Sequence, residues 1–243
     1  MSPVAERTQE PLVRLGGAFM VSPELAEQEK AVGLPPRTLY FRGRTAVLGN
    51  PEPGVVAAVI AIFPEWLVEA ALVRSLPADR AVAAYLEACW TWSRGAFASV
   101  EDPGRVADLG FRVADAVDPG ALALFRGWRD APRPADDPAR LGHVLMLLRE
   151  FRGGIHFAAL RAVGLTVAQA VALDPGGGRP RFERTAWRPE DYEPVLASVE
   201  GRDDLAQRWR TAMRLTDERF DEALGVLTDA ERVEFADRIL ALG

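Results

Sequence analysis

The feature that most constrains the fold is the lack of any run in which β-branched and polar residues alternate, which is the pattern of a half-buried strand. The chain instead has apolar residues at helical spacing, repeatedly preceded by start signals such as Ser22-Pro23, Asp102-Pro103 and Asp118-Pro119. An acceptor side chain followed by proline is typical of the first turn of a helix. The sequence therefore predicts an all-α fold.

The helical patterns divide the chain into successive segments. One helix begins at Pro23, and others are expected over 55–74 (with Pro64 as a potential break), 78–100, 102–117, 118–128, 139–151, 155–164, 166–173, 189–199, 203–222 and 229–242. The pair Gly153-Gly154 is expected to end one helix, because glycine is a poor helix former. This break would place His156 at the N-terminus of the next helix, where free backbone N–H groups favour an anion.

The composition and one glycine-rich segment suggest the domain organisation. Hydrophobic residues make up 49% of 243 residues, enough for a substantial core. The stretch DPGGGRPRFERTAW, 174–187, lacks apolar periodicity and is expected to be a linker. We therefore predict a multi-helix main domain over 1–175 and a smaller helical unit over 187–243. The second unit is similar to the end of a degenerate winged-helix domain, which suggests a transcriptional regulator as one function.

The charge distribution argues against nucleic-acid binding. Residues 187–243 contain 8 arginines and 14 acidic residues, a net charge of −6, so the rest of the chain is neutral with 21 basic (29 − 8) and 21 acidic (35 − 14) residues. Affinity for nucleic acid depends on basic groups that neutralise phosphates. We therefore expect no nucleic-acid partner, and a helical unit that packs on the main body or on a partner protein.

Several other classes of protein find no support in the sequence. The N-terminal MSPVAERTQEPLVRL has no apolar core of a signal peptide, and the longest apolar run, Val55 to Phe63, is too short for a membrane span. A cytoplasmic protein with no membrane partner is expected. Cys89 is the single cysteine, and the two histidines are thirteen residues apart, so we expect no disulfide, no metal and no cofactor. No phosphate-binding loop or G-x-S-x-G elbow occurs.

The stretch LGHVLMLLREFRGGIH, 141–156, contains both histidines and ends in charged residues. On a helix His143 and Glu150 share one face, and Arg149 lies on the neighbouring face. These residues could form a structural network around a core histidine, or they could line a binding pocket or an active site. Between Arg140 and Arg161 there are four arginines and one acidic residue, which leaves a positive surplus.

A second arginine cluster favours the pocket. The segment PPRTLYFRGRTAVLGNPEPG carries Arg37, Arg42 and Arg44 within the eight residues 37–44, which include no acidic residue. Guanidinium groups suit carboxylate, sulfate or phosphate ligands, so the two acid-poor segments suggest one shared anion pocket. The alternative is three solvated arginines in a surface loop. Arginine as such is uninformative, because Lys30 is the only lysine among 29 basic residues.

Three motifs resemble a poorly characterised helix-turn-helix-like family of helical proteins from GC-rich bacteria. The family pattern Y-F-x-G-R-x-A-P-L-G is matched by TLYFRGRTAVLG at 38–49, its F-x-P helix by IFPEWLVEAAL at 62–72, and H-x-x-x-L-L-R-E-H-R-G-D-G-H by HVLMLLREFRGGIH at 143–156. WRPEDY at 187–192 is similar to the start of the family's C-terminal part. The chain departs from the pattern at Phe151, where the family has histidine, and at Gly154, where it has aspartate.

The resemblance implies a function among small natural-product pathways, because family members occur among such biosynthetic genes. We expect an anionic small-molecule substrate and assistance in elimination, displacement or ring closure, of which aziridine formation is one example. Whether the chain is itself an enzyme, a lyase or cyclase, or a supporting subunit stays open, since two polar groups are missing. The expected catalytic residues are His156, His143 and Glu150, and the expected substrate-binding residues are Arg44, Arg149, Arg152 and Tyr40.

Apolar residues in the last helices predict an interface. They exceed what a small appendage can bury, so we expect them to pack on the main body or on a homologous partner or second copy. They are Trp209, Leu215, Phe220, Leu224, Leu227, Phe235, Ile239 and Leu240.

Overall fold

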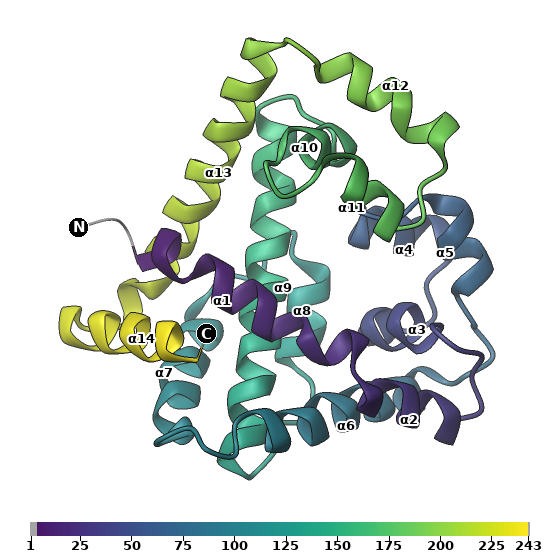
Figure 1. Ribbon diagram of the computed structural model, residues 1–243. Coiled ribbons are helices and arrows are strands. Elements are labelled where there is room, and N and C mark those ends of the chain that lie inside the picture. The colour runs from purple at the N-terminus through teal and green to yellow at the C-terminus, as the bar shows by residue number, and fades with distance from the viewer. Residues whose placement is uncertain (1–3, 243) are drawn as a thin grey trace. The chain divides into compact units, whose positions relative to one another are not determined.

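The computed structural model describes residues 4–242, in which every regular element is a helix and no β-strand occurs. Figure 1 shows this arrangement of helices. The all-α class predicted from the sequence is confirmed. The chain folds into two compact units. Unit 1 holds the described residues of Met1–Asn50, Val73–Gly154 and Asp217–Gly243, and unit 2 holds Pro51–Leu72 and Ile155–Thr216.

Two long helices contribute residues to both units. They are α9 (Asp137–Ala162) and α13 (Asp203–Ala223). The other helices of unit 1 are α1 (Val4–Ala18), α2 (Pro23–Ala31), α3 (Leu39–Thr45), α6 (Ala78–Ala96), α7 (Pro103–Ala116), α8 (Ala123–Arg129) and α14 (Asp229–Ala241), with short 3-10 turns at Phe19–Val21, Ala46–Leu48 and Leu224–Val226. The other helices of unit 2 are α4 (Pro53–Ile60), α5 (Glu65–Ala71), α10 (Val167–Leu173), α11 (Gly178–Arg184) and α12 (Pro189–Val199).

Side-chain caps explain where several helices begin. Ser22 accepts a hydrogen bond from the backbone N–H of Leu25 at the start of α2, and Asp102 caps α7 in the same way. Thr166 and Thr228 each form a capping box, with Gln169 and Glu231 respectively. Because such caps satisfy backbone donors that lack a partner in the first turn, the local sequence determines these boundaries.

The expected helix break at Gly153-Gly154 is wrong, because α9 runs without interruption from Asp137 to Ala162. His156 therefore lies inside a helix and has no access to a helix N-terminus. The cost of glycine in a helix, roughly 1 kcal/mol each, is outweighed by the packing of α9. Gly154 in addition makes room for a neighbour, since a Cβ atom there would lie 2.7 Å from Cδ2 of Leu122.

Two further expectations about local structure are also wrong. The segment 174–187 is not an irregular linker, because it contains α11 with the buried side chain of Phe182. The pair Asp118-Pro119 does not start a helix. Asp118 instead accepts a hydrogen bond from the N–H of Gly120 in a turn, and α8 begins at Ala123. The burial of Phe182 overrides the local composition in α11, whereas at Asp118 a local side-chain turn takes the place of the helix start.

The apolar residues of the last helices are mostly buried within the chain. Phe220, Leu224, Leu227, Phe235 and Ile239 belong to the core of unit 1, whereas Leu240 is 40% exposed. Trp209 and Leu215 pack against the core of unit 2. The boundaries of these two units do not coincide with those of the predicted domains, 1–175 and 187–243. The predicted domains are parts that would fold independently, and this division stays a prediction.

Within residues 4–242 no single helix has both the length and the apolar character needed to cross a bilayer. Only α9 and α10 taken together reach that length and composition, and they are bent by 96°.

Candidate functional site

A cluster of buried charged groups lies where α3 contacts α9 in unit 1. The guanidinium of Arg44 donates from Nε to Oε1 of Glu150 at 3.0 Å and from Nη2 to Oε2 at 2.9 Å, a two-point pairing. Its Nη1 donates to the hydroxyl of Tyr40 at 2.9 Å. Arg149 donates from Nη1 to the same Oε1 of Glu150 at 2.8 Å. The structure therefore brings together four of the predicted site residues, Tyr40, Arg44, Arg149 and Glu150.

The charged groups of this cluster are buried, so the ionisation of each group depends on its neighbours. The side chains of Arg44 and Glu150 are only 9% and 3% exposed. Burial opposes ionisation of Glu150, but Arg44 and Arg149 outweigh it, so the pKa of Glu150 lies below its usual value. Burial would likewise lower the pKa of Arg44, but Glu150 raises it above the ordinary value. All three groups are therefore charged at neutral pH, and the cluster carries a net charge of +1.

One donor edge of Arg149 is not used by the protein. Its Nε is buried and has no hydrogen-bond partner among the described residues. Gly17 of α1 borders this edge, since a Cβ atom at Gly17 would lie 2.9 Å from that Nε. Gly17 thus lies directly against the donor, where a methyl group would clash with it. A buried cation with a free donor is suited to hold an anion.

Two aromatic residues that contact the cluster carry no recognisable sign of a functional role in the sequence. Trp128 donates from Nε1 to the backbone carbonyl of Arg44 at 3.0 Å, which holds the end of α3 in place. Tyr85 of α6 is fully buried and interacts electrostatically with Arg44, Arg149, Glu150 and Tyr40. Both residues lie on apolar helices whose patterns are typical of core packing, so only the tertiary structure identifies them.

His143 lies on α9 in an aromatic environment. Its Nδ1 accepts a hydrogen bond from Nε1 of Trp90 at 3.1 Å, and the ring of Phe111 lies 5.9 Å away, measured between centroids. Burial and the nearby Arg133 lower the pKa of His143 to about 4. The imidazole is therefore neutral at pH 7, with its proton on Nε2. This Nε2 is buried and has no hydrogen-bond partner among the described residues, and the predicted catalytic role of His143 stays a prediction.

The last two predicted site residues, Arg152 and His156, form contacts outside this cluster. Arg152 of α9 donates to Asp217 at 2.9 Å and to Gln9 in unit 1. His156 belongs to unit 2, where its Nδ1 lies 3.1 Å from the hydroxyl of Thr216. The convergence of Arg44 and Arg149 is thus observed, whereas the participation of Arg152 and His156 in the same site stays a prediction.

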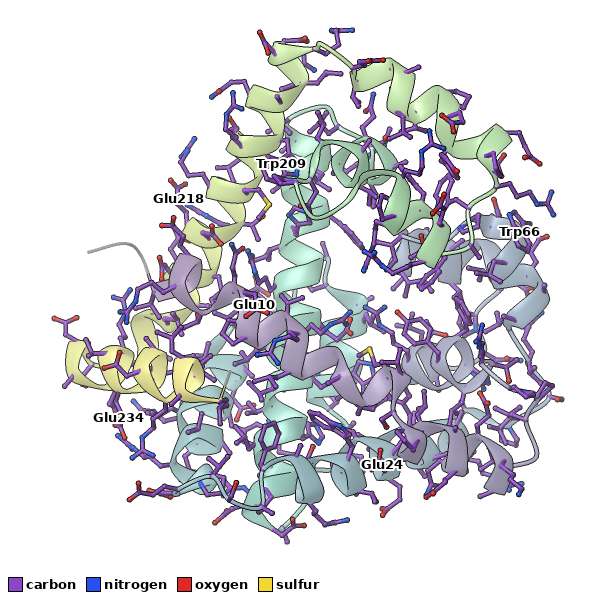
Figure 2. All side chains as sticks on the ribbon, in the orientation of Figure 1. Glu10, Glu24, Trp66, Trp209, Glu218 and Glu234 are labelled. Atoms are coloured by element: carbon purple, nitrogen blue, oxygen red, sulfur yellow. The ribbon has the colours of Figure 1, made fainter. Side chains whose placement is uncertain are left out.

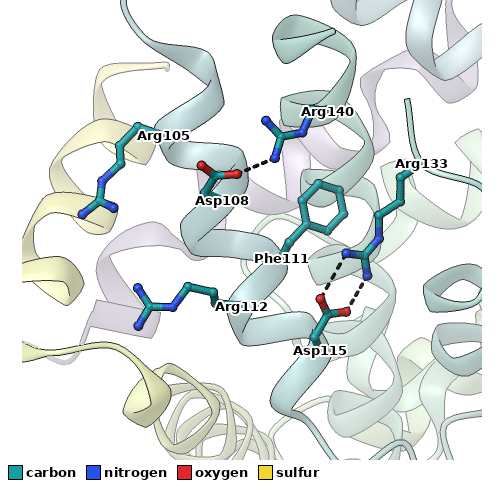
Figure 3. A pocket seen from close by; sticks show the side chains of 7 residues that line it. All are labelled: Arg105, Asp108, Phe111, Arg112, Asp115, Arg133 and Arg140. Atoms are coloured by element: carbon teal, nitrogen blue, oxygen red, sulfur yellow. Dashed lines mark hydrogen bonds and ion pairs between the residues drawn. The ribbon is translucent and has the colours of Figure 1, made fainter. Parts of the chain in front are cut away.

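A shallow depression on unit 1 has a volume of about 480 Å³ and contains four arginines (Figure 3). Arg133 pairs with Asp115 and stacks 4.2 Å from the ring of Phe111, and Arg140 pairs with Asp108. The other two arginines, Arg105 and Arg112, bind Glu234 and Glu231 of α14, and Glu234 is labelled in Figure 2. Because each guanidinium already has a carboxylate partner, this depression offers no surplus donor comparable to that of Arg149.

Unit 2 contains a second feature of functional interest. Helices α10 and α11 contact each other and are joined by the four residues 174–177, which include Gly176 and Gly177. This connectivity is that of a helix-turn-helix, in which a turn of three or four residues often contains glycine. Its turn and its second helix lie in the segment 174–187, whose composition suggested a linker, N-terminal to the predicted winged-helix-like part. With no strand among residues 4–242, that part has no wing hairpin within them.

Comparisons with known proteins add one finding. A family model described as a helix-turn-helix family matches residues 5–239, which is nearly the whole chain. Neither the curated proteins nor the solved structures contain a significant match. Within the part of the chain that the structure describes, no group of three or more His, Cys, Asp or Glu residues is placed to hold a metal ion.

Proposed function

The chain belongs to this helix-turn-helix family, and from that premise we propose that it binds a small anionic metabolite through Arg149 in unit 1. The observation that carries the proposal is the unpartnered, buried Nε of Arg149 in a cluster with one more cation than anion. A buried donor without a partner costs about 1–3 kcal/mol. An anion at this edge would remove that cost and neutralise the cluster.

Glu150 has a supporting role in this proposal. Its two oxygens are held by Arg44, and one of them also accepts from Nη1 of Arg149. These bonds fix the plane of the Arg149 guanidinium, so its other edge is oriented before a ligand arrives. Such preorganisation reduces the entropic cost of binding. Carboxylate, sulfate and phosphate groups fit, because they match the paired N–H groups of a guanidinium edge.

The proposed reaction is departure of that anion from the metabolite. In a displacement or ring closure the lone pair of a nucleophile forms the new bond to carbon as the carbon–oxygen bond breaks, and in an elimination the electron pair of a neighbouring C–H bond becomes the new π bond while a base takes the proton. In each case the leaving oxygen takes the electron pair of the broken carbon–oxygen bond. A fixed positive charge in a buried site stabilises the negative charge that develops there. Closure of an aziridine ring within a natural-product pathway is one such reaction. A homologous chain or a second copy as partner remains part of the proposal, since Phe151 and Gly154 replace two polar groups of the family pattern.

Sulfate binding by two variants tests the proposal. We expect sulfate, added at constant ionic strength, to raise the melting temperature of the wild type until the site is saturated. At a sulfate concentration of a hundred times Kd, the free energy of unfolding should increase by about 2.7 kcal/mol. Arg149→Gln should abolish this effect, since Arg44 still holds Glu150 but the cationic edge is lost. Gly17→Ala should weaken binding at least tenfold, because its methyl group would lie 2.9 Å from Nε and displace the Arg149 edge.

Matched controls separate a specific site from general effects of sulfate, which stabilises most proteins because it is excluded from their surface. Arg188→Gln removes an exposed guanidinium that stacks 4.4 Å from the ring of Trp66, labelled in Figure 2, and should respond to sulfate as the wild type does. Gly153→Ala adds a methyl group that meets no atom within 4 Å. An equal sulfate response in wild type and Arg149→Gln would refute the proposed site.

The helix-turn-helix connectivity of α10 and α11 favours a second candidate function, a DNA-binding regulator with a ligand site. The charges weigh against it. Residues 167–199 contain four arginines and five acidic residues, a net charge of −1. On α11, Arg179 is already paired with Glu193 of α12. A surface that approaches phosphates needs a surplus of basic groups.

We expect no retention of duplex DNA even at about 50 mM salt, where electrostatic binding is strong. A mobility-shift assay with labelled genomic fragments and with a random duplex measures this directly. Retention that weakens linearly with the logarithm of the salt concentration would instead support the regulator, and Arg181→Ala and Arg184→Ala on α11 would then be the variants to compare.

A further inference from the structure

The hydroxyl of Tyr85 is a buried polar group that the protein itself does not satisfy. The residue is 0% exposed, and its hydroxyl has no hydrogen-bond partner among the described residues. Leaving such a group unpaired costs about 1–3 kcal/mol, whereas phenylalanine would fill the same space without that cost. Only a partner from outside the described residues could satisfy this hydroxyl.

The ring of Tyr85 is held firmly in place. The ring of Phe19 meets it edge-on with centroids 4.9 Å apart, and the ring of Trp128 lies 5.2 Å away. On the side of α3, Gly43 allows close approach, since a Cβ atom there would lie 2.7 Å from Cδ2 of Tyr85. Because three neighbours confine the ring, the position of the hydroxyl is determined by the fold.

The surroundings of the hydroxyl make it a donor. Burial raises the pKa of Tyr85 well above its ordinary value, despite the opposing effects of Arg44 and Arg149. The group therefore keeps its proton at neutral pH. The nearby acceptors bond other donors and not this hydroxyl: Glu150 accepts from both arginines, and the Tyr40 hydroxyl accepts from Arg44.

We infer that the Tyr85 hydroxyl donates to the same ligand as the free edge of Arg149, and that this ligand is an oxyanion with at least two accepting oxygens. The inference rests on the proposed function and narrows the ligand class. The two donors come from different helices, α6 and α9, and both are buried without partners in one cluster. A carboxylate, sulfate or phosphate provides separate oxygens for a tyrosine hydroxyl and a guanidinium edge.

Tyr85→Phe tests the inference, with sulfate and acetate as probes in titration calorimetry on the full chain. Without a probe, we expect the melting temperature to stay equal or to rise, because an unsatisfied hydroxyl is removed. The Kd for the probe should increase by roughly tenfold to a hundredfold, the effect of a hydrogen bond to a charged group. Tyr192→Phe is the matched control. Tyr192 is buried and stacked on Phe182, with its hydroxyl 3.1 Å from Nη1 of Arg179, and its replacement should not change probe binding.

The possible outcomes separate this inference from the proposed function. If Tyr85→Phe binds the probes as the wild type does while Arg149→Gln does not, the role of Tyr85 is wrong and the anion site stands. If the wild type binds neither probe, both fall. If Tyr85→Phe lowers the melting temperature by several degrees without a probe, the hydroxyl has a structural partner and the inference is overturned.

Discussion

Replacing Glu150 by alanine is expected to destabilise the protein by about 3–5 kcal/mol, because it leaves two buried guanidinium groups without their shared carboxylate. Arg44 loses both charge-assisted bonds to Glu150, and Arg149 loses one. Proteins are stable by only about 5–15 kcal/mol, so this is a large part of the total. Urea unfolding measures the difference.

Glu193→Ala is the matched control. Glu193 also pairs with an arginine, Arg179, but both side chains are about half exposed. An exposed pair contributes about 0–1 kcal/mol. Similar losses of unfolding free energy in Glu150→Ala and Glu193→Ala would contradict the prediction that burial strengthens the interactions of Glu150. The same reasoning applies to Arg44→Ala, which should reduce stability strongly, because Arg44 is the buried partner of Glu150.

The stability that Glu150 contributes depends on pH. Its pKa in the folded protein is depressed below the ordinary value of 4.5. A carboxyl group with a depressed folded-state pKa stabilises the protein above its unfolded pKa, and this contribution is lost as the pH falls toward the folded value. Wild type and Glu150→Ala should therefore differ most near neutral pH and converge in acid below pH 4.5.

Replacing Gly16 by alanine is expected to cost about 2–3 kcal/mol, because α1 and α9 approach each other too closely for a methyl group. A Cβ atom at Gly16 would lie 2.4 Å from the backbone oxygen of Leu145 and 2.8 Å from its carbonyl carbon. Backbone atoms of a helix cannot move away cheaply, so the two helices must separate. Figure 1 shows α1 passing across α9.

Gly153→Ala provides the control for this effect. Gly153 also lies in a helix, but an added Cβ atom meets nothing within 4 Å. Alanine should therefore raise stability by about 0.5–1 kcal/mol through its better helix propensity. Thermal unfolding of both variants checks the prediction. An unchanged stability of Gly16→Ala would show that the close contact between α1 and α9 does not contribute to the stability of the fold.

The two departures from the family pattern have a packing explanation. Phe151 lies between the rings of Phe125 and Phe220, at centroid distances of 5.2 and 5.8 Å. Gly154 lies against Leu122, which occupies the space that a longer side chain would need. Apolar contacts thus take the place of the histidine and aspartate of the pattern. The acid-base groups expected from that pattern are absent at these two positions, and the buried cation of Arg149 remains.

The sequence by itself determined the helical class and many helix boundaries. Apolar spacing and capping residues act over a few positions, so α12 spans Pro189–Val199 as predicted, and Ser22-Pro23 and Asp102-Pro103 start α2 and α7. The same local reasoning failed at Gly153-Gly154 and at 174–187. There the packing of α9 and the burial of Phe182 outweigh weak intrinsic preferences.

Only the tertiary structure decided which charges meet. The sequence indicated that Arg44, Arg149 and Glu150 share one region, and both arginines were expected to bind a ligand. In the folded chain Glu150 itself occupies the guanidinium of Arg44, 106 residues away, and leaves one edge of Arg149 free beside Gly17. Such pairing depends on how α1, α3 and α9 cross, and no short-range pattern encodes a crossing between helices so far apart in the chain.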